Sequence, residues 1–444
     1  MKAKIGFVSL GCPKNEVDCE MMLARVAQAG YQIVPEDIEA DVVIVNTCAF
    51  IQSAKEEAIE NILDLVWLKE NRSLKGIIVT GCLAQRYFED IQKSLPEVDA
   101  ALSLGDEVSI CEAIEAVMKG EKYFRHSPND CLEMEGDRVL THEGFAYLRI
   151  SEGCDNRCAY CAIPSIRGPL RSRKIEDILK EAEGFSKMGI GEIIVVAQDT
   201  TAYGSDLYGR LALPELLEKL AAPELGFRWI RLMYCYPDKV TPELCRVMAE
   251  HRNICRYIDL PIQHYSDNVL TAMNRHGGSE AIRNAVSILR ETMPDIALRT
   301  TVMVGFPGEK DKDFSILSNF VKEARFQRLG AFIYSREEGT AGYAMENRTT
   351  KKTKEGRLNS IMQTQFAISE AYQESFVGQT VEVMCEGYDP GVKMYFGRTQ
   401  YHAPEIDGVV YFSSERKSIP IGEFLQVKIT ETMDYDLIGK EVRK

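Results

Sequence analysis

Three short apolar runs in the first hundred residues each end in a cysteine, and this repeat constrains the fold of the N-terminal part more than any other feature. The runs are 4–12 (KIGFVSLGC), 41–48 (DVVIVNTC) and 76–82 (GIIVTGC). A short apolar run that stops at a turn residue is typical of a buried strand entering a loop. A single cysteine at such a place is usually a small buried hydrophobic residue. Three of them suggest a shared role.

Amphipathic helical stretches separate the runs. We expect helices within 17–30, 52–71 and 85–95, closed by Gly30 in the first case and by Pro96 in the last. Strands that alternate with helices at this spacing predict a parallel sheet with helices on its faces.

The loops that follow parallel strands gather at the carboxyl edge of the sheet, where open α/β sheets hold their binding sites. We therefore expect Cys12, Cys48 and Cys82 to meet at one edge. Three converging thiolates suit a metal or an iron-sulfur cluster. The alternative is three unrelated cysteines, each packed in its own loop.

Length, composition and charge limit the class of protein. The chain has 444 residues and 45% hydrophobic content, which favours two or three domains. We find no apolar run long enough to span a membrane and no secretory leader, so we expect a cytoplasmic protein. Its 13 cysteines then indicate reduced thiols rather than disulfides. A net charge of -14 favours a basic partner over nucleic-acid phosphates, although one local basic face could still bind RNA.

The pattern changes twice further along the chain. Six strand-like runs alternate with helical stretches and predict an open, partial (β/α)6 TIM-like barrel, while short alternating runs from about residue 375 predict a small antiparallel β-barrel. The expected strands of the partial barrel are 145–150, 192–199, 229–237, 256–264, 297–309 and 330–340. We predict an N-terminal α/β domain at 1–125, a linker at 126–143, the partial barrel at 144–372 and the β-barrel at 373–444.

A second group of cysteines lies just after the first strand of the partial barrel. Cys154, Cys158 and Cys161 have C-x3-C-x2-C spacing, with Tyr160 before the third cysteine. Zinc sites usually take four ligands from two separated pairs, and no second pair follows. Three thiolates on one loop would instead leave one iron of a cubane cluster open for chemistry. The other seven cysteines lack ligand-like spacing and are interpreted as ordinary residues: Cys19, Cys111, Cys131, Cys235, Cys245, Cys255 and Cys385.

These motifs resemble those of the radical S-adenosylmethionine (SAM) methylthiotransferases. The resemblance rests on SLGCPKN, VNTCAF, TGCLAQR, SEGCDNRCAYCAIPSIRG and LPIQH, followed by a β-barrel of the TRAM type. It implies two [4Fe-4S] clusters and SAM as both radical source and methyl donor. A 5′-deoxyadenosyl radical would abstract hydrogen from the substrate. The radical cluster would take Cys154, Cys158 and Cys161, and the auxiliary cluster, which carries the sulfur, would take Cys12, Cys48 and Cys82.

Within this family, SLGCPKNEVD, QDTTAYG, LMYCYPD and IYSREEGT are most similar to the RimO branch. That branch methylthiolates the β-carbon of an aspartate in small-subunit ribosomal protein twelve. Residues 375–444, the alternating part of the predicted β-barrel, hold eight basic and eleven acidic residues, which suits a basic protein partner better than RNA. An electron donor such as flavodoxin or ferredoxin and a sulfur source would also be partners. The alternatives are a tRNA adenosine methylthiotransferase and a non-enzymatic iron-sulfur protein that binds RNA or senses redox state.

The resemblance and the ends of the barrel strands also indicate residues that could hold SAM, namely Tyr160, Gln198, Asp199, Arg299 and Gly305. Many radical SAM enzymes have Gly-Gly-Glu where this chain has QDT. Arg299 could instead form a structural ion pair inside the barrel.

Three further side chains have open roles. His264, at the end of the fourth barrel strand, either faces the cavity or is a structural histidine. Arg167 and Arg171 either meet a substrate carboxylate or are solvated charges.

Overall fold

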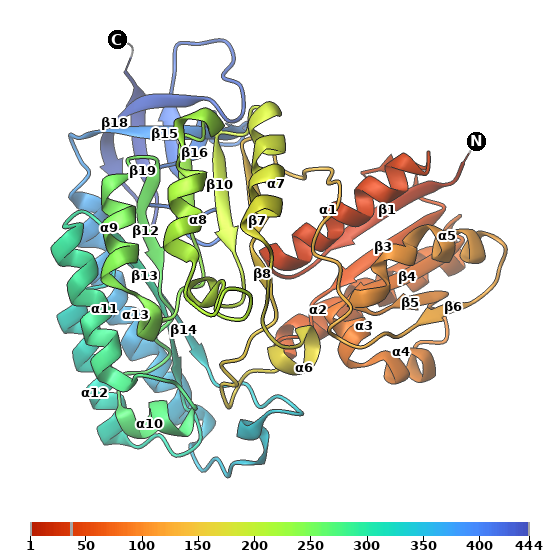
Figure 1. The fold of residues 1–444 in the computed structure, drawn as a ribbon, viewed down its shortest axis with the longest axis horizontal. Helices are drawn as coiled ribbons and strands as arrows, with labels where there is room; N and C mark the ends of the chain where they lie inside the picture. Colours follow the sequence, from red (N-terminus) through yellow and green to blue (C-terminus); the bar gives the residue numbers. More distant parts are fainter. Residues whose placement is uncertain (1, 36–38, 443–444) are drawn as a thin grey trace. The chain divides into compact units, whose positions relative to one another are not determined.

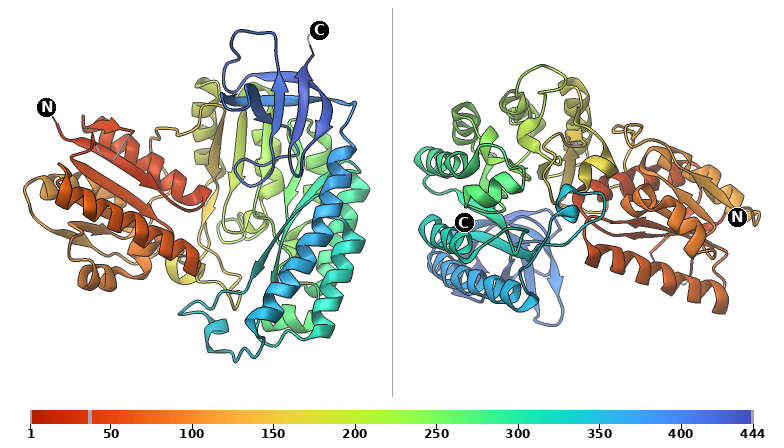
Figure 2. Two further views of the ribbon diagram at one scale, coloured as in Figure 1. Left: turned by 180° about the vertical axis from the view of Figure 1, so that it is seen from behind. Right: turned by 90° about the horizontal axis from the view of Figure 1, so that it is seen from below.

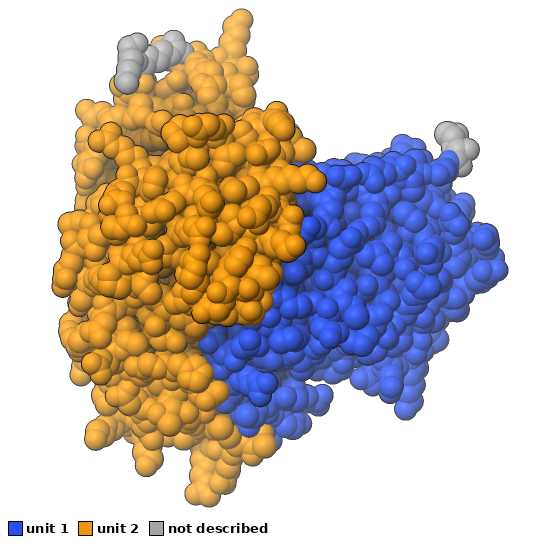
Figure 3. All heavy atoms as spheres, viewed as in Figure 1, with its two compact units in different colours: residues 1–141, 151–171, 335–343 blue, residues 142–150, 172–334, 344–444 orange. Residues whose placement is uncertain are grey.

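The computed structural model describes residues 2–35 and 39–442, which form two compact units (Figure 3). Unit 1 comprises 1–141, 151–171 and 335–343. Unit 2 comprises 142–150, 172–334 and 344–444. Unit 1 therefore contains both groups of three cysteines, because the segment 151–171 clusters with the N-terminal part of the chain.

A parallel sheet forms the centre of unit 1 (Figure 1). The three runs that end in cysteine form neighbouring strands β1, β3 and β4, as the sequence predicts. Three short strands, which the sequence analysis does not predict, extend the sheet on both sides. The strand order is β2-β1-β3-β4-β5-β6, with bounds β1 Lys4–Ser9, β2 Gln32–Val34, β3 Val42–Thr47, β4 Gly76–Gly81, β5 Ala100–Leu102 and β6 Tyr123–Arg125.

Helices cover both faces of this sheet because alternate strand residues point to opposite sides. On β3, Val43 and Val45 join one apolar core, whereas Val42 and Ile44 join the other. The helix expected at 85–95 is broken at Tyr87 into two shorter helices. The helical elements are α1 Pro13–Gln28, α2 Gln52–Asn71, α3 Cys82–Arg86, α4 Phe88–Ser94, η2 Leu104–Ser109 and α5 Ile110–Met118.

The segment predicted as a linker, 126–143, has no helix or strand. Within unit 1 it packs along α1, where the backbone oxygen of Glu20 accepts from Val139 N at 3.2 Å. The Glu20 carboxylate accepts from Thr141 N at 2.8 Å. This segment is therefore tied to the N-terminal helix.

Two distant segments complete unit 1. Residues 151–171 contain β8 Ser151–Glu152 and α6 Ile163–Arg167, and lead into β9 Arg171–Ser172. Ala162 and Ile166 belong to the same apolar core as Val43 and Val45. The segment 335–343 is held by Glu337, whose carboxylate pairs with Lys55 at 2.9 Å and Arg86 at 3.1 Å. Burial thus explains why these segments cluster with the N-terminal sheet.

Unit 2 is built on an open, six-stranded parallel sheet, and the order β14-β13-β12-β11-β10-β7 confirms the predicted partial barrel. Its helices lie along the outer face of the sheet (Figure 2). The strands are β7 Phe145–Arg149, β10 Glu192–Val196, β11 Trp229–Leu232, β12 Ile254–Asp259, β13 Ala297–Val304 and β14 Arg328–Ile333. The helical elements are α7 Ile175–Lys187, η3 Thr200–Ala202, α8 Leu213–Leu220, η4 Pro223–Leu225, η5 Pro237–Lys239, α9 Pro242–Glu250, α10 Asp267–Ala272, α11 Gly278–Thr292, α12 Asp311–Ala324, η6 Ala341–Ala344 (which begins in unit 1) and α13 Lys351–Glu374.

The C-terminal part of unit 2 is a closed five-stranded barrel in the order β15-β16-β17-β19-β18. The sequence predicts an antiparallel barrel, and every pair is antiparallel except β17 with β19, which is parallel. Buried Glu192 at the start of β10 holds this barrel to the larger sheet, through Arg231 at 2.6 Å and Arg398 at 2.7 Å. The strands are β15 Thr380–Asp389, β16 Met394–Arg398, β17 Val410–Ser413, β18 Phe424–Thr432 and β19 Leu437–Glu441.

The predicted fold class is confirmed, whereas the domain boundaries proposed from the sequence stay a prediction. Among the described residues, no helix combines the length and apolar character needed to cross a bilayer.

Candidate functional site

The three N-terminal cysteines lie together at the carboxyl edge of the unit 1 sheet. Cys12 precedes α1, Cys48 follows β3, and Cys82 is the first residue of α3. The three thiols lie close enough to influence one another, because the charges of Cys12 and Cys48 both raise the pKa of the Cys82 thiol. The edge expected from the strand directions is thus where the thiols gather.

Gly81 makes the approach of Cys82 possible. Its backbone has φ +86°, and an added Cβ would lie 2.6 Å from the backbone oxygen of Thr47 and 2.5 Å from Asn46 Oδ1. Only glycine adopts this conformation without strain and leaves room for the neighbouring strand. The glycine before Cys82 in the GIIVTGC run therefore brings the loop after β4 against the loop after β3.

Asn15 connects all three cysteine loops, and the sequence analysis does not identify it. Its Nδ2 donates to the backbone oxygens of Leu10 at 3.1 Å and Thr47 at 2.8 Å. Its Oδ1 accepts from Cys82 Sγ at 3.4 Å. The only sequence signal is a polar residue one helical turn after Cys12, on a helix face that is otherwise buried.

The surroundings of the thiols affect them differently. Burial raises the pKa of Cys12, but the charges of Lys14 and Arg167 outweigh burial and place the pKa below its ordinary value. Burial raises the pKa of Cys48, and raises that of Cys82 to about 12 although Arg167 opposes it. A bound cation favours the thiolate form and would reverse these increases.

The donor set fits a cluster better than a single ion. In the part of the chain that the structure describes, no group of three or more His, Cys, Asp or Glu side chains is arranged around one metal ion. In a cubane cluster each thiolate binds a different iron, so the three sulfur atoms need not surround one point. Three thiols are the ligands typical of such clusters.

The second cysteine loop, also in unit 1, folds back on itself. Cys154 N donates to Gly168 O at 3.1 Å, and Asn156 Nδ2 donates to Cys154 Sγ at 3.4 Å. Gly153 has φ +74°, and a Cβ there would lie 1.9 Å from the backbone oxygen of Pro169. Cys154 and Cys158 are buried and Cys161 is half-buried.

Two of the residues predicted to contact SAM follow β10 in unit 2. Gln198 is half-buried. The carboxylate of Asp199 is buried and already accepts from Thr201 Oγ1 at 2.6 Å, Ala202 N at 3.1 Å and Lys239 Nζ at 2.9 Å. Asp199 therefore shapes the loop that carries Gln198.

The other predicted SAM contacts come from different segments of the chain. Tyr160 lies half-buried in unit 1. Gly305, in unit 2, follows β13 with φ +75°, and its backbone oxygen accepts from Asn347 Nδ2 at 2.9 Å. Arg299 pairs with Asp259 at 2.6 Å, which is the structural ion pair that the sequence left open.

His264 is fully buried, and its Nδ1 accepts from Ser266 N at 3.0 Å. Burial lowers the pKa of His264 to about 4, so the ring is neutral near pH 7. Its Nε2 is buried and has no hydrogen-bond partner among the described residues, so the ring is held through Nδ1.

The sequence left two roles open for Arg167 and Arg171, a contact to a substrate carboxylate or a solvated charge. Arg167 is not a solvated charge, because it is 1% exposed and pairs with Asp18 and Glu152, each at 2.9 Å. Arg171 is half-buried and donates to backbone oxygens, including that of Asn129 at 3.3 Å.

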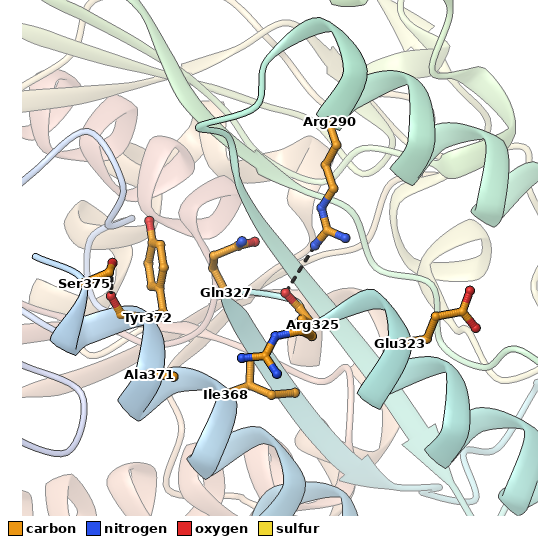
Figure 4. A pocket seen from close by; sticks show the side chains of 8 residues that line it. All are labelled: Arg290, Glu323, Arg325, Gln327, Ile368, Ala371, Tyr372 and Ser375. Carbon is orange, nitrogen blue, oxygen red and sulfur yellow. Dashed lines mark hydrogen bonds between the residues drawn. The ribbon is translucent and has the colours of Figure 1, made fainter.

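Unit 2 also has a cavity of about 350 Å³ among its outer helices (Figure 4). Arg290 extends across it and donates to the backbone oxygen of Arg325 at 3.2 Å. Tyr372 of α13 lines another side. The cavity has no cysteine in its lining, so it is separate from the candidate site.

Comparisons with known families agree with this architecture. Residues 4–103 match the model described as uncharacterized protein family UPF0004, residues 148–321 match the radical SAM superfamily, and residues 377–442 match the TRAM domain. Among solved structures, the radical SAM methyltransferase TsrM from Kitasatospora setae with cobalamin and a [4Fe-4S] cluster has a TM-score of 0.56 at 13% identity. The match covers 77% of each chain. A second TsrM structure, with tryptophan and a SAM analogue, has a TM-score of 0.54 at 14% identity, covering 74% of this chain and 72% of that one. The fold is thus of the radical SAM class.

Curated relatives narrow the class. The ribosomal protein uS12 methylthiotransferase RimO of Acetivibrio thermocellus is 47% identical over 100% of this chain and 99% of its own length. RimO of Thermoanaerobacter sp. is 46% identical over 98% of this chain and 99% of its own length. RimO of Clostridium tetani is 45% identical over 99% of this chain and 98% of its own length. The chain belongs to the RimO family of methylthiotransferases.

Proposed function

We propose that this protein is a radical SAM methylthiotransferase that adds a methylthio group to the β-carbon of an aspartate in ribosomal protein uS12. The observation that carries the proposal is the 45–47% identity to RimO proteins along almost the full chain. The gathering of Cys12, Cys48 and Cys82 at one sheet edge supports it independently.

The radical cluster would be held by Cys154, Cys158 and Cys161, and the auxiliary cluster by Cys12, Cys48 and Cys82. When bound, the first supplies the electron that cleaves SAM and the second carries the sulfur to be inserted. A radical route suits this substrate because a β-hydrogen next to a carboxylate is too weakly acidic for ordinary base chemistry.

The protein's own residues shape these sites. Asn156 orients Cys154, and Gly342 N donates to Ala159 O at 2.6 Å, which closes the segment 335–343 over the cysteine loop. Ala159 is 3% exposed, and exclusion of water from a loop of this kind protects radical chemistry.

For SAM itself we propose Tyr160, Gln198 and Gly305 as contacts, with Asp199 fixing the loop of Gln198. Gly305 has φ +75°, a conformation that favours glycine, and an added Cβ there would lie 2.6 Å from Cγ of Lys354. Arg299 is committed to Asp259, and we assign it to the ion pair.

The remaining partners follow from the chemistry. The reaction requires a one-electron donor, such as flavodoxin or ferredoxin, and a source of sulfur. Modification of a ribosomal protein places the enzyme in the cytoplasm.

The test is mass spectrometry on full-length protein reconstituted with iron and sulfide. The protein is incubated anaerobically with SAM and reductant, with uS12 in one tube and unmodified tRNA in another. We expect a methylthio mass gain on an aspartate of uS12. Cys158→Ala should abolish it, together with 5′-deoxyadenosine release, whereas Cys131→Ala at an exposed position should not. A methylthio mass gain on tRNA alone would contradict the proposed substrate, uS12. Absence of SAM cleavage would contradict the proposed class of enzyme.

A further inference from the structure

One buried guanidinium lies between the two cysteine loops of unit 1. Arg167, the last residue of α6, is 1% exposed. Its Nη2 donates to Asn15 Oδ1 at 2.6 Å and to Asp18 Oδ2 at 2.9 Å, and its Nη1 donates to Glu152 Oε2 at 2.9 Å. The side chain thus joins the helix after Cys12 to the strand before Cys154.

This charge acts on the whole N-terminal thiol group. Arg167 lowers the pKa of Cys12, Cys48 and Cys82, although burial acts in the opposite direction on all three. Asn15 Oδ1 accepts from both Arg167 Nη2 at 2.6 Å and Cys82 Sγ at 3.4 Å, so the guanidinium and the Cys82 thiol share one hydrogen-bond acceptor. Lys14 also lowers the pKa of Cys12.

The same residue is connected to the radical-cluster loop. The Glu152 carboxylate that pairs with Arg167 also accepts from Gly153 N at 3.2 Å, next to Cys154. The residue after Arg167, Gly168, accepts from Cys154 N at 3.1 Å. A guanidinium suits this place because its planar fork can serve several acceptors at once, which an ammonium cannot do in the same geometry.

We propose that Arg167 is a positioning residue that raises the reduction potential of the auxiliary cluster through its buried positive charge, which lies next to Cys82 across the shared acceptor Asn15. The inference rests on the proposed function, in which Cys12, Cys48 and Cys82 hold that cluster. Reduction adds negative charge to a cluster, so a nearby buried cation stabilises the reduced form. Asp18 and Glu152 hold the guanidinium in place, and their two carboxylates oppose its effect on the cluster.

The experiment is a potentiometric titration of the auxiliary cluster, followed by electron paramagnetic resonance. It uses the full-length chain with Cys154, Cys158 and Cys161 replaced by Ala, so that only the auxiliary cluster contributes. In this background we compare Arg167→Gln, Asp18→Asn and a control, Arg171→Gln. Arg171 lies four residues further along and donates to backbone oxygens only.

We expect Arg167→Gln to lower the reduced-to-oxidised ratio at a fixed potential about tenfold, a downward shift of about 59 mV for a one-electron couple. Asp18→Asn removes a negative charge while keeping the side-chain shape, so it should shift the potential upward. Arg171→Gln should leave it unchanged.

Each outcome decides the proposal. Opposite shifts in Arg167→Gln and Asp18→Asn support it, and a loaded cluster whose potential moves in neither variant overturns it while leaving the two-cluster proposal intact. If Arg167→Gln fails to fold, Asp18→Asn decides alone, and no upward shift overturns the inference. If the triple-alanine background binds no cluster, the proposed function fails at the auxiliary site and the inference fails with it.

Discussion

Gly81→Ala should destabilise unit 1 more than an alanine at an open glycine that also has a positive φ. Gly81 has φ +86° and ψ -158°, a region that residues with a side chain almost never occupy. The new Cβ would also lie 2.6 Å from Thr47 O and 2.7 Å from Thr47 N. These backbone atoms belong to the paired strand β3, so they cannot move aside without breaking the sheet.

The two effects can be assigned separate magnitudes. Backbone strain in this region costs about 1–3 kcal/mol, and the overpacking adds about 1–3 kcal/mol. The free energy of unfolding should therefore fall by about 2–6 kcal/mol, from the sum of these two ranges. Gly120→Ala supplies the matched control, since Gly120 has φ +78° with nothing within 4 Å of an added Cβ. It should lose only about 1–2 kcal/mol.

The assay is denaturant unfolding of both variants, with iron content measured after reconstitution. We expect Gly81→Ala to unfold at lower denaturant than Gly120→Ala and to bind less iron, because Cys82 is displaced from Cys48. Equal midpoints for the two variants would refute the claim that close approach to β3 makes Gly81 necessary.

Three further outcomes follow. Asn15→Ala removes the side chain that joins the three cysteine loops, so iron bound at the auxiliary site should fall by more than half while iron bound by the second cysteine loop is retained. This is measured by iron analysis in the triple-alanine background and in wild type, and full loading would contradict it. Glu192→Gln should cost about 3–5 kcal/mol in denaturant unfolding, because it removes the carboxylate charge that pairs with the buried guanidinium groups of Arg231 and Arg398. Glu382 forms a more exposed ion pair with Arg228, so Glu382→Gln should cost about 0–1 kcal/mol. Similar costs for Glu192→Gln and Glu382→Gln would argue against burial as the cause. The pKa of His264 is lowered to about 4, below its usual 6.5, so the unfolded chain binds the proton more readily. Stability should therefore be complete above pH 6.5 and fall by about 3 kcal/mol towards pH 4, with a shallower slope in His264→Gln; an unchanged slope would exclude His264 as its source.

The pattern of apolar and polar residues predicted the strands and helices that short-range interactions determine. The runs that became β1, β3 and β4 are apolar and end at turn residues, and the stretch 52–71 has the periodicity of a helix, which matches α2. The short strand β5 was missed because three residues carry too little pattern to recognise. The parallel pair of β17 and β19 was missed because barrel closure, rather than the residues of either strand, decides which strands become neighbours.

The cysteines of the site could be predicted because strand direction places them and their spacing marks them. The residues around them could not. Arg167 is held in place by its ion pair with Asp18, which is 149 positions away in the chain. Its sequence neighbours give no sign that it is buried. Asn15 likewise depends on Thr47, which only the sheet brings close.

The clustering of both cysteine groups in one unit has a physical cause that bears on function. Ala162 and Ile166 bury their side chains in the apolar core beneath β3 and β4, and Arg167 then reaches Asn15 beside Cys82. Burying apolar surface supplies the stability, while the ion pairs fix the orientation, because buried charges tolerate few alternative arrangements. The loop of Cys154 is therefore anchored on the N-terminal sheet by side chains that follow it in sequence. A change that loosens this anchor, such as Ile166→Ala, should disturb both cysteine groups together, whereas independent loss of one would show that the shared core does not couple them.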